Sequence, residues 1–398
     1  MAGEPHTDAT QTVFLIAAEE SGDRLGAGLM KALRAADPHI RFAGIGGRHM
    51  AEEGLVSLFP TTELAIIGFM AIPKRLPIIL RRIREATEAV VKARPDVLVI
   101  IDSPDFTHRV ARRVRARDPS IPIVNYVSPT VWVWRPKRAK AMRAYVDQLL
   151  AVLPFEPEVH RKLSGPPCIY VGHPLLENLE SLRPNSDELA RRSAQPPLLL
   201  VLPGSRRSEI RRNMAVFGET LRILRSEGVS FEAVLPTVPA LLDSVRAASA
   251  SWPVQPKIVV SDSDKRAAFR AARAALAKSG TVTLELALAG VPMVTAYRVM
   301  ELEAFVARRV IQTSSIILAN LILGENVIPE FLQQDFTPQN LAPALKDVLG
   351  DTPARRRQID AFARLEGIMS TGGSRPSELA ADAVIAVLRQ RNPNETST

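Results

Sequence analysis

Short runs of continuous apolar residues recur along this chain, and each ends in a polar or glycine-rich stretch ahead of a helix-like segment. Residues 12–18, 96–101 and 198–202 are the clearest runs. Such runs are typical of strands buried on both faces, as in a parallel sheet. Parallel strands need a crossover connection, usually a helix. Because the alternation continues through both halves, it predicts an α/β fold with two doubly wound, Rossmann-like domains.

The same alternation sets the expected elements. The predicted strands of the first half are residues 12–18, 40–45, 96–101, 121–127, 148–153 and 169–171. Those of the second half are residues 198–202, 231–235, 257–260, 274–277 and 292–295. Helices are predicted at residues 24–36, 281–290, 338–349, 353–366 and 375–390, and a disordered tail at 391–398. A polar, proline-bearing linker at residues 182–197 divides a first domain, residues 1–182, from a second, residues 183–350.

Composition narrows the class of protein. The 398 residues include one cysteine, Cys168, so no disulfide can form within the chain. No stretch reaches the roughly 18 apolar residues of a membrane-spanning helix. The polar N-terminus lacks the basic start and apolar core of a signal peptide. We therefore expect a cytoplasmic protein.

The net charge of +9 favours phosphate-bearing ligands, nucleic acid or an anionic membrane surface. The alternative is that the many arginines reflect the codon usage of a GC-rich genome. Aromatic residues make up 5% of the chain, and no zinc-finger spacing occurs. Nucleic-acid binding would therefore rest on charge alone, and we expect no nucleic-acid partner.

Residues 64–91 combine apolar side chains with a basic cluster. The candidates for membrane contact are Ile67, Phe69, Met70, Arg75, Arg81 and Arg82. Apolar residues beside cations suit a peripheral attachment to a membrane surface. The alternative is a helix that faces the core and turns its basic side to solvent.

Two loops of the second half suit a nucleotide diphosphate. The run 198–202 ends in Pro203-Gly204-Ser205, with Arg206 and Arg207 directly after it. Gly204 would let the backbone approach a ligand, and amides at a helix start attract anions. The second loop is Lys278-Ser279-Gly280-Thr281, followed by Glu285, whose carboxylate could accept the hydroxyls of a ribose. The alternatives are a solvated arginine-rich helix face and a buried glutamate paired with arginine.

Polar clusters also follow the strands of the first half. Glu19 to Asp23 follow the first predicted strand as a loop, and Asp102 to Asp105 follow the third. Ligands bind beyond the carboxyl ends of parallel strands. We therefore expect the clusters of both domains to face a common cleft.

The motifs resemble those of one enzyme family in the same order along the chain. They are Glu19-x-Ser21-Gly22-Asp23, Asp102-Ser103-Pro104-Asp105-Phe106, Ser128-Pro129-x-Val131-Trp132-x-Trp134-Arg135, Leu153-Pro154-Phe155-Glu156, Gly172-His173-Pro174, Pro203-Gly204-Ser205-Arg206, Ser279-Gly280-Thr281-x-Thr283-Leu284-Glu285, Tyr297-Arg298 and Asn320-x-Ile322. This series is similar to that of the lipid-A-disaccharide synthases, inverting glycosyltransferases with the two-domain GT-B fold. The resemblance covers the chain almost from end to end.

The resemblance implies a reaction and its partners. UDP-2,3-diacylglucosamine and 2,3-diacylglucosamine 1-phosphate would give the lipid A disaccharide 1-phosphate and UDP at the cytoplasmic face of the inner membrane. The first domain would hold the acceptor and the second the UDP-sugar. The helices of residues 351–398 would pack back on the first domain or be exchanged in a homodimer. No cofactor and no metal are implied.

Residue roles follow from the same resemblance. A one-step inversion needs a single base. Asp102 is the first candidate, Asp105 is the competitor, and Glu19 and Ser21 are further residues of this site. Arg206 would contact the diphosphate together with the glycine and hydroxyl residues named above, whereas Arg207 could also face solvent. Glu285 would hold the ribose, and Asn320 would lie near the nucleotide.

Other interpretations of the protein's function remain open. Another UDP-sugar enzyme of the GT-B fold is possible, although the Ser128–Arg135 run argues against it. A non-catalytic protein that binds membranes or nucleic acid would tolerate the loss of Asp102. A Rossmann dehydrogenase is disfavoured because the first strand lacks the glycine fingerprint.

Overall fold

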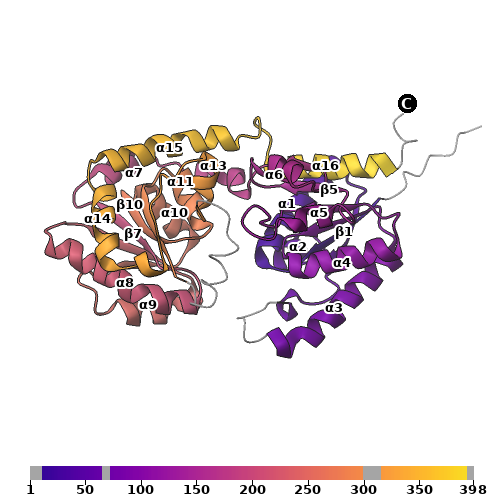
Figure 1. The fold of residues 1–398 in the computed structure, drawn as a ribbon, viewed down its shortest axis with the longest axis horizontal. Coiled ribbons are helices and arrows are strands. Elements are labelled where there is room, and N and C mark those ends of the chain that lie inside the picture. The colour runs from indigo at the N-terminus through magenta and orange to yellow at the C-terminus, as the bar shows by residue number, and fades with distance from the viewer. Residues whose placement is uncertain (1–10, 65–71, 299–314, 392–398) are drawn as a thin grey trace, which may run out of the picture. The chain divides into compact units, whose positions relative to one another are not determined.

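The computed structural model describes residues 11–64, 72–298 and 315–391. It divides the chain into two compact units, unit 1 (Met1–Glu177 with Thr371–Thr398) and unit 2 (Asn178–Ser370). Each unit contains a six-stranded parallel sheet flanked by helices (Figure 1). The predicted fold class, two doubly wound α/β domains, is confirmed.

Unit 1 alternates strands and helices along its whole length. Its strands are β1 (Thr12–Ala17), β2 (Arg41–Ile45), β3 (Val97–Ile101), β4 (Ile123–Tyr126), β5 (Gln148–Ala151) and β6 (Cys168–Tyr170). Its helices are α1 (Glu20–Ala36), α2 (Arg48–Glu52), α3 (Ile72–Ala93), α4 (Pro104–Arg117), α5 (Lys137–Met142), α6 (Glu156–Lys162) and α16 (Pro376–Arg391), with the short 3-10 helix η1 (Thr61–Glu63). The strand order is β2-β1-β3-β4-β5-β6, and all pairs are parallel.

Unit 2 repeats this plan. Its strands are β7 (Leu198–Leu202), β8 (Glu232–Pro236), β9 (Lys257–Val259), β10 (Ala274–Lys278), β11 (Met293–Tyr297) and β12 (Glu330–Leu332). Its helices are α7 (Ser186–Ser193), α8 (Arg207–Ser226), α9 (Leu242–Ser249), α10 (Asp262–Ala271), α11 (Val282–Leu288), α13 (Leu318–Leu323), α14 (Pro338–Leu349) and α15 (Pro353–Met369). The 3-10 helices are η4 (Pro239–Leu241) and η5 (Gln333–Asp335), while η3 (Pro174–Leu182) spans the boundary between the units. The strand order is β12-β11-β10-β7-β8-β9.

Most of the apolar runs form strands whose side chains are buried on both faces of the sheet. All five residues of β3 and all five of β7 are buried, as expected for central strands covered by helices on both faces. Each unit has its own core, built around Ile16, Ile100 and Ile123 in unit 1 and around Val201, Phe217 and Leu276 in unit 2. The eleven strands predicted from these runs are all present.

Two local features differ from the sequence prediction. Helix α1 begins at Glu20, so the segment predicted as a loop forms the first helical turn. This turn packs closely on β3, because a Cβ at Gly22 would lie 3.2 Å from the carbonyl oxygen of Ile101. Strand β12 was not predicted, because Pro329 and Glu330 interrupt the apolar residues around it.

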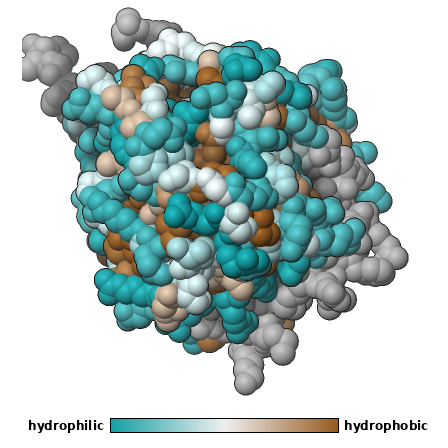
Figure 2. All heavy atoms as spheres, turned by 90° about the vertical axis from the view of Figure 1, so that its left-hand side faces the viewer, coloured by the Kyte–Doolittle hydropathy of each residue, from teal (hydrophilic) through white to brown (hydrophobic). Residues whose placement is uncertain are grey.

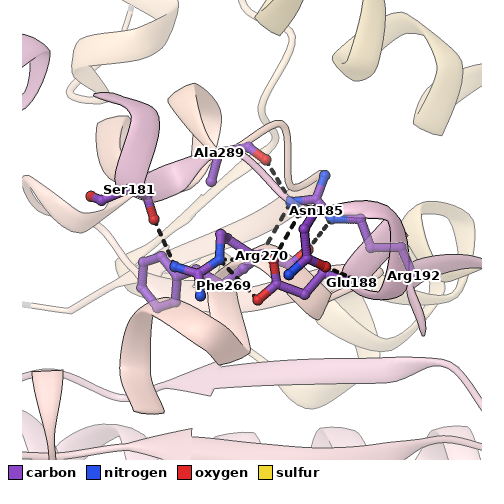
Figure 3. Close-up of polar contacts among 7 residues, drawn as sticks. All are labelled: Ser181, Asn185, Glu188, Arg192, Phe269, Arg270 and Ala289. Atoms are coloured by element: carbon purple, nitrogen blue, oxygen red, sulfur yellow. Dashed lines mark hydrogen bonds and ion pairs between the residues drawn. The ribbon is translucent and has the colours of Figure 1, made fainter. Parts of the chain in front are cut away.

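The predicted linker contains a helix that is anchored to unit 2. Asn185 and Glu188 form a reciprocal capping box at the start of α7. Arg270 of α10 donates to the Glu188 carboxylate at 2.8 Å and to the Ser181 carbonyl at 2.7 Å (Figure 3). Arg192 donates to the carbonyls of Phe269, Arg270 and Ala289, and its burial lowers its pKa to about 10. The polar composition of this stretch therefore reflects arginine contacts rather than a free connection.

The C-terminal helices belong to different units. Helix α15 is part of unit 2, where it packs on α11, α13 and α14. Helix α16 is part of unit 1, where it packs along α1 (Figure 1). The Glu177 carboxylate accepts the Ser377 amide at 2.6 Å and so fixes the start of α16. The unit boundary follows Glu177, whereas the sequence placed it after residue 182.

The surface of unit 2 on the side of α14 is a mosaic of hydrophilic areas and small apolar patches (Figure 2). Within residues 11–64, 72–298 and 315–391, no helix is long and apolar enough to cross a membrane. The candidates Ile67, Phe69 and Met70, like the tail beyond residue 391, lie outside the described residues.

Candidate active site

The strand order of unit 1 reverses between β1 and β3. The chain leaves β1 for β2 on one side and later returns to β3 on the other. Loops that follow such a pair of strands diverge around a crevice, which is the usual ligand site of an open α/β sheet. Ser21 and Asp102 meet here, with the Ser21 hydroxyl donating to Asp102 Oδ2 at 2.9 Å.

Asp102 is held by hydrogen bonds to its side chain and its backbone. The Ser103 amide donates to Asp102 Oδ1 at 2.7 Å, so each carboxylate oxygen accepts one hydrogen bond. The Asp102 amide donates to the Tyr126 carbonyl at 3.1 Å, and the Thr107 hydroxyl donates to the Asp102 carbonyl at 2.7 Å. The half-buried carboxylate is therefore presented in one orientation at the edge of the sheet.

Asp105 and Glu19 have more exposed positions. The Asp105 side chain lies in the first turn of α4, is 79% exposed, and is 3.3 Å from the Arg138 guanidinium. Glu19 directly precedes α1 and is exposed. The fourth acidic residue of these two motifs, Asp23, is buried and accepts the amides of Gly47, His49 and Met50. Asp23 therefore caps α2 and has a structural role.

The tryptophan-containing run after β4 is fixed by buried polar residues. Ser128 Oγ lies 2.8 Å from His160 Nε2, and Trp132 Nε1 donates to Glu156 at 3.3 Å. Glu156 also accepts the amides of Val152 and Leu153, but its burial raises its pKa to about 7. Burial lowers the pKa of His160 to about 4. These contacts hold the run after β4 at the same edge of the sheet as Asp102.

Unit 2 has a corresponding reversal between β7 and β10, and the two predicted phosphate loops follow these strands. Gly204 has φ +123°, and a Cβ there would lie 2.4 Å from Glu209 Oε2. Glu209 reaches back from α8 and accepts the amides of Ser205 at 2.9 Å and Arg206 at 3.3 Å. The first loop is thus a tight turn closed around a carboxylate.

The side chains predicted to bind phosphate project from this turn. Ser205, Arg206 and Arg207 are exposed, and the Arg206 side chain is 78% exposed. Arg206 Nη1 lies 3.5 Å from Glu209 Oε1, a weak exposed contact that leaves the guanidinium accessible to a ligand. Asn213 of α8 fixes the base of the turn by donating to the Pro203 carbonyl at 2.6 Å.

The second loop lies between β10 and α11. Gly280 and Thr281 are exposed, while Ser279 is buried. Glu285, one turn into α11, accepts two hydrogen bonds from the Lys265 ammonium, at 3.0 and 3.2 Å. The predicted alternative of a paired glutamate therefore applies, with lysine in place of arginine. A ribose would have to share this carboxylate with Lys265.

Asn320 lies in the interior of unit 2, with 1% of its surface exposed. Its oxygen accepts the amides of Val327 and Ile328, and its nitrogen donates to the Ile328 carbonyl at 3.0 Å. The side chain thus ties α13 to the loop that precedes β12. The structure gives it the geometry of a residue that positions a loop.

The pairing of two charged residues at this edge was not predicted from the sequence. Lys278 ends β10, and its ammonium lies 3.1 Å from Glu209 Oε1, so the pair bridges the two phosphate loops. Burial raises the pKa of Glu209, but the Lys278 ammonium and the Ser205 amide lower it by a larger amount. The pKa of Glu209 is therefore below its ordinary value. The sequence signal for a charged residue at this edge was a lysine at the end of an otherwise apolar strand.

The basic residues predicted for membrane contact differ in their surroundings. Arg75 lies in the first turn of α3, and its side chain is outside the described part. Arg81 is exposed. Arg82 turns inward, pairs with Glu63 at 2.7 Å and stacks over the Phe59 ring. Its role in this structure is to fasten α3 to η1.

Metal ligation finds no support in the part of the chain that the structure describes. Its histidine, cysteine, aspartate and glutamate side chains do not form a group of three or more that could hold a metal ion.

Known proteins resemble this chain over nearly its whole length. The profile of the family described as Lipid-A-disaccharide synthetase matches residues 13–384. The chain is 65% identical over 391 residues to the lipid-A-disaccharide synthase of Rhodopseudomonas palustris (strain ATCC BAA-98 / CGA009), covering 98% of this chain and 100% of that one. It is 64% identical over 389 residues to that of Nitrobacter hamburgensis, covering 98% of each.

Solved structures share the fold at low sequence identity. A structure of S. aureus MnaA with UDP has a TM-score of 0.61 at 12% identity and covers 98% of each chain. The MurG structure from Acinetobacter baumannii has a TM-score of 0.59 at 14% identity and covers 94% of this chain and 99% of that one. These likenesses support two Rossmann-like domains of the GT-B kind.

Proposed function

The chain belongs to the lipid-A-disaccharide synthase family of UDP-sugar glycosyltransferases, and on that premise we propose how its residues perform the transfer. The donor is UDP-2,3-diacylglucosamine, and the acceptor is 2,3-diacylglucosamine 1-phosphate. The 6-hydroxyl of the acceptor attacks the anomeric carbon of the donor. The bond from that carbon to the diphosphate breaks, which gives a β(1→6) disaccharide 1-phosphate and UDP.

Asp102 is the proposed base. It takes the proton of the acceptor hydroxyl as the new bond forms, and a single carboxylate suffices because the reaction inverts in one step. The observation that carries this assignment is the pair of hydrogen bonds from Ser21 and Ser103, which aim the carboxylate at the strand-order reversal. Asp105 points to solvent beside Arg138, which favours a supporting role such as contact with the acceptor phosphate through that arginine.

Unit 2 is proposed to hold UDP. Arg206 would contact the diphosphate and offset the charge that develops on the leaving oxygen. The amides at the start of α11 and the hydroxyls of Ser279 and Thr281 would add donors. Glu285 would accept a ribose hydroxyl while Lys265 keeps it in place, and Asn320 would support the site by positioning the chain after α13.

We also propose that the protein attaches to the cytoplasmic face of the inner membrane through α3. The substrates carry acyl chains, so the enzyme must reach them at a lipid surface. Leu76, Ile78 and Leu80 of α3 are 38–42% exposed, and Arg84 lines a groove with Arg113 and Arg117 of α4. Exposed apolar side chains beside arginines suit a surface of anionic lipid.

A UDP-release assay tests the proposed reaction. Purified protein should release UDP when donor and acceptor are both present, and release should fall to background when the acceptor is omitted. Activity should persist in EDTA, because the proposed steps use side chains alone. Equal UDP release without acceptor would contradict transfer, and an EDTA loss restored by Mg²⁺ would contradict the metal-free mechanism.

A further inference from the structure

A mostly buried ion pair bridges the two phosphate loops of unit 2. Lys278 and Glu209 are 15% and 11% exposed, and their charged atoms are 3.1 Å apart. The Lys278 ammonium also lies 4.8 Å from the centre of the Tyr297 ring. This pair stands between β7 and β10, where the strand order reverses and α/β sheets bind ligands.

Glu209 occupies the groups that an anion would use on this loop. One carboxylate oxygen accepts the amides of Ser205 and Arg206, and the other faces Lys278. Two successive backbone amides with a nearby cation form the usual cradle for a phosphate at such a turn. The carboxylate therefore stands in for a phosphate oxygen within the protein itself.

A second observation indicates that a ligand binds at this edge of the unit 2 sheet. Ser279 directly follows Lys278 and is 6% exposed, yet its hydroxyl has no hydrogen-bond partner among the described residues. Buried hydroxyls nearly always have a partner. A ligand oxygen at the loop would supply one.

We propose that Lys278 binds the diphosphate of the nucleotide and that Glu209 is a built-in competitor for the same groups. In the ligand-free protein the carboxylate neutralises Lys278 and occupies the two amides. When the diphosphate binds, Lys278 exchanges its carboxylate partner for a phosphate oxygen. Glu209 thereby weakens UDP binding and favours release of UDP after transfer. The inference rests on the proposed UDP site.

Calorimetric titration of the full chain with UDP, paired with NMR titration with uridine, tests this exchange. Lys278→Met should weaken UDP binding by about tenfold, the usual effect of losing a hydrogen bond to a charged group, and leave uridine binding unchanged. Glu209→Gln, which keeps an oxygen for the amides, should strengthen UDP binding about three- to tenfold by removing a nearby negative charge. The double variant should bind UDP about as the unmodified protein does, because the two charge changes offset each other.

Controls separate a phosphate contact from a structural role. Lys278→Arg keeps the charge and should retain most UDP affinity. Lys346→Met removes an exposed ammonium 2.7 Å from Glu227 elsewhere in unit 2 and should leave UDP affinity unchanged. In the enzyme assay, UDP should inhibit Glu209→Gln more strongly than the unmodified protein.

Two results would overturn the inference while leaving the UDP site intact. One is unchanged UDP affinity in Lys278→Met. The other is weaker UDP binding in Glu209→Gln, which would make the carboxylate a support of the loop rather than a competitor. If the unmodified protein does not bind UDP, the proposed function fails first, and the inference fails with it.

Discussion

Asp102 and Ser103 adopt left-handed backbone conformations, with φ of 52° and 45°. Each such non-glycine residue costs roughly 1–3 kcal/mol, so the surrounding structure must hold it. The Thr107 hydroxyl and the Tyr126 carbonyl supply part of that support. Strain of this kind gathers at functional sites, which agrees with the role proposed for Asp102.

Substitution of the two aspartates separates their roles. Asp102→Asn keeps the size of the side chain and can still bond to Ser21 and Ser103, but it removes the base. Turnover should fall by about 10²- to 10⁴-fold, while UDP affinity stays the same. Asp105→Asn, the matched control, should lose less than about tenfold because its carboxylate is exposed. A larger loss in Asp105→Asn than in Asp102→Asn, with both proteins folded, would reverse the assignment.

His108 makes the stability of unit 1 depend on pH. Its Nδ1 lies 2.9 Å from the Tyr145 hydroxyl, and burial lowers its pKa to about 3. Since this folded pKa is below the unfolded value, the unfolded state binds the proton first as the pH falls. The contribution is full above the unfolded pKa of about 6.5 and is lost progressively below it.

The free-energy advantage of the unmodified protein over His108→Gln should therefore shrink by about 2 kcal/mol between pH 6.5 and pH 5. Urea unfolding followed by tryptophan fluorescence can measure it. In a Trp252→Phe background, the remaining tryptophans, Trp132 and Trp134, both report on unit 1. The exposed His39→Gln serves as control. A difference between wild type and His108→Gln that does not vary with pH would refute this account.

Single residues show where sequence reasoning stops. The sequence placed Asp102 and Arg206 correctly at strand ends, because an apolar run followed by a polar loop marks that edge. It could not reveal that Glu209 fills the first phosphate loop from within, since that contact depends on the φ of Gly204 and the reach of a side chain in α8. The burial of Asn320 likewise depends on contacts that form only in three dimensions.

At the scale of elements, periodicity predicted the strands well and the helix starts less well. Helix α1 starts four residues early because Gly22 allows its first turn to pack on β3. Helix α7 was missed because its eight residues include few apolar side chains, and arginine contacts with α10 help to stabilise it. Both elements also make tertiary contacts with segments distant in sequence.

Helix α3 gives a prediction at the element scale. The triple variant Leu76→Ser, Ile78→Ser, Leu80→Ser should weaken binding to vesicles of anionic lipid by about 10- to 100-fold, since three apolar side chains no longer enter the lipid. Sedimentation with vesicles measures this, and added salt should weaken binding further. The matched control is Ile359→Ser with Ile368→Ser on α15, whose side chains are 39% and 40% exposed. Equal losses in both variants, or none in the first, would remove α3 from the membrane contact.

At the scale of the whole molecule, the two units repeat one design. Each has a six-stranded parallel sheet whose order reverses once, and candidate site residues follow the strands at that reversal, Asp102 in unit 1 and Arg206 in unit 2. The rhythm of apolar runs was enough to predict two doubly wound α/β domains, but not β12 or the order of the strands. The pattern of apolar runs could not predict that α15 belongs to unit 2 and α16 to unit 1. This grouping depends on which surfaces the last helices cover.

The most direct test of the account is the identity of the product. The purified protein should be incubated with UDP-2,3-diacylglucosamine and 2,3-diacylglucosamine 1-phosphate, and the lipid product examined by mass spectrometry and NMR. We predict a tetraacylated disaccharide 1-phosphate with a β(1→6) linkage, formed by the unmodified protein and nearly absent with Asp102→Asn. A product with the α configuration, or equal product formation by Asp102→Asn, would contradict transfer by a single base at this site.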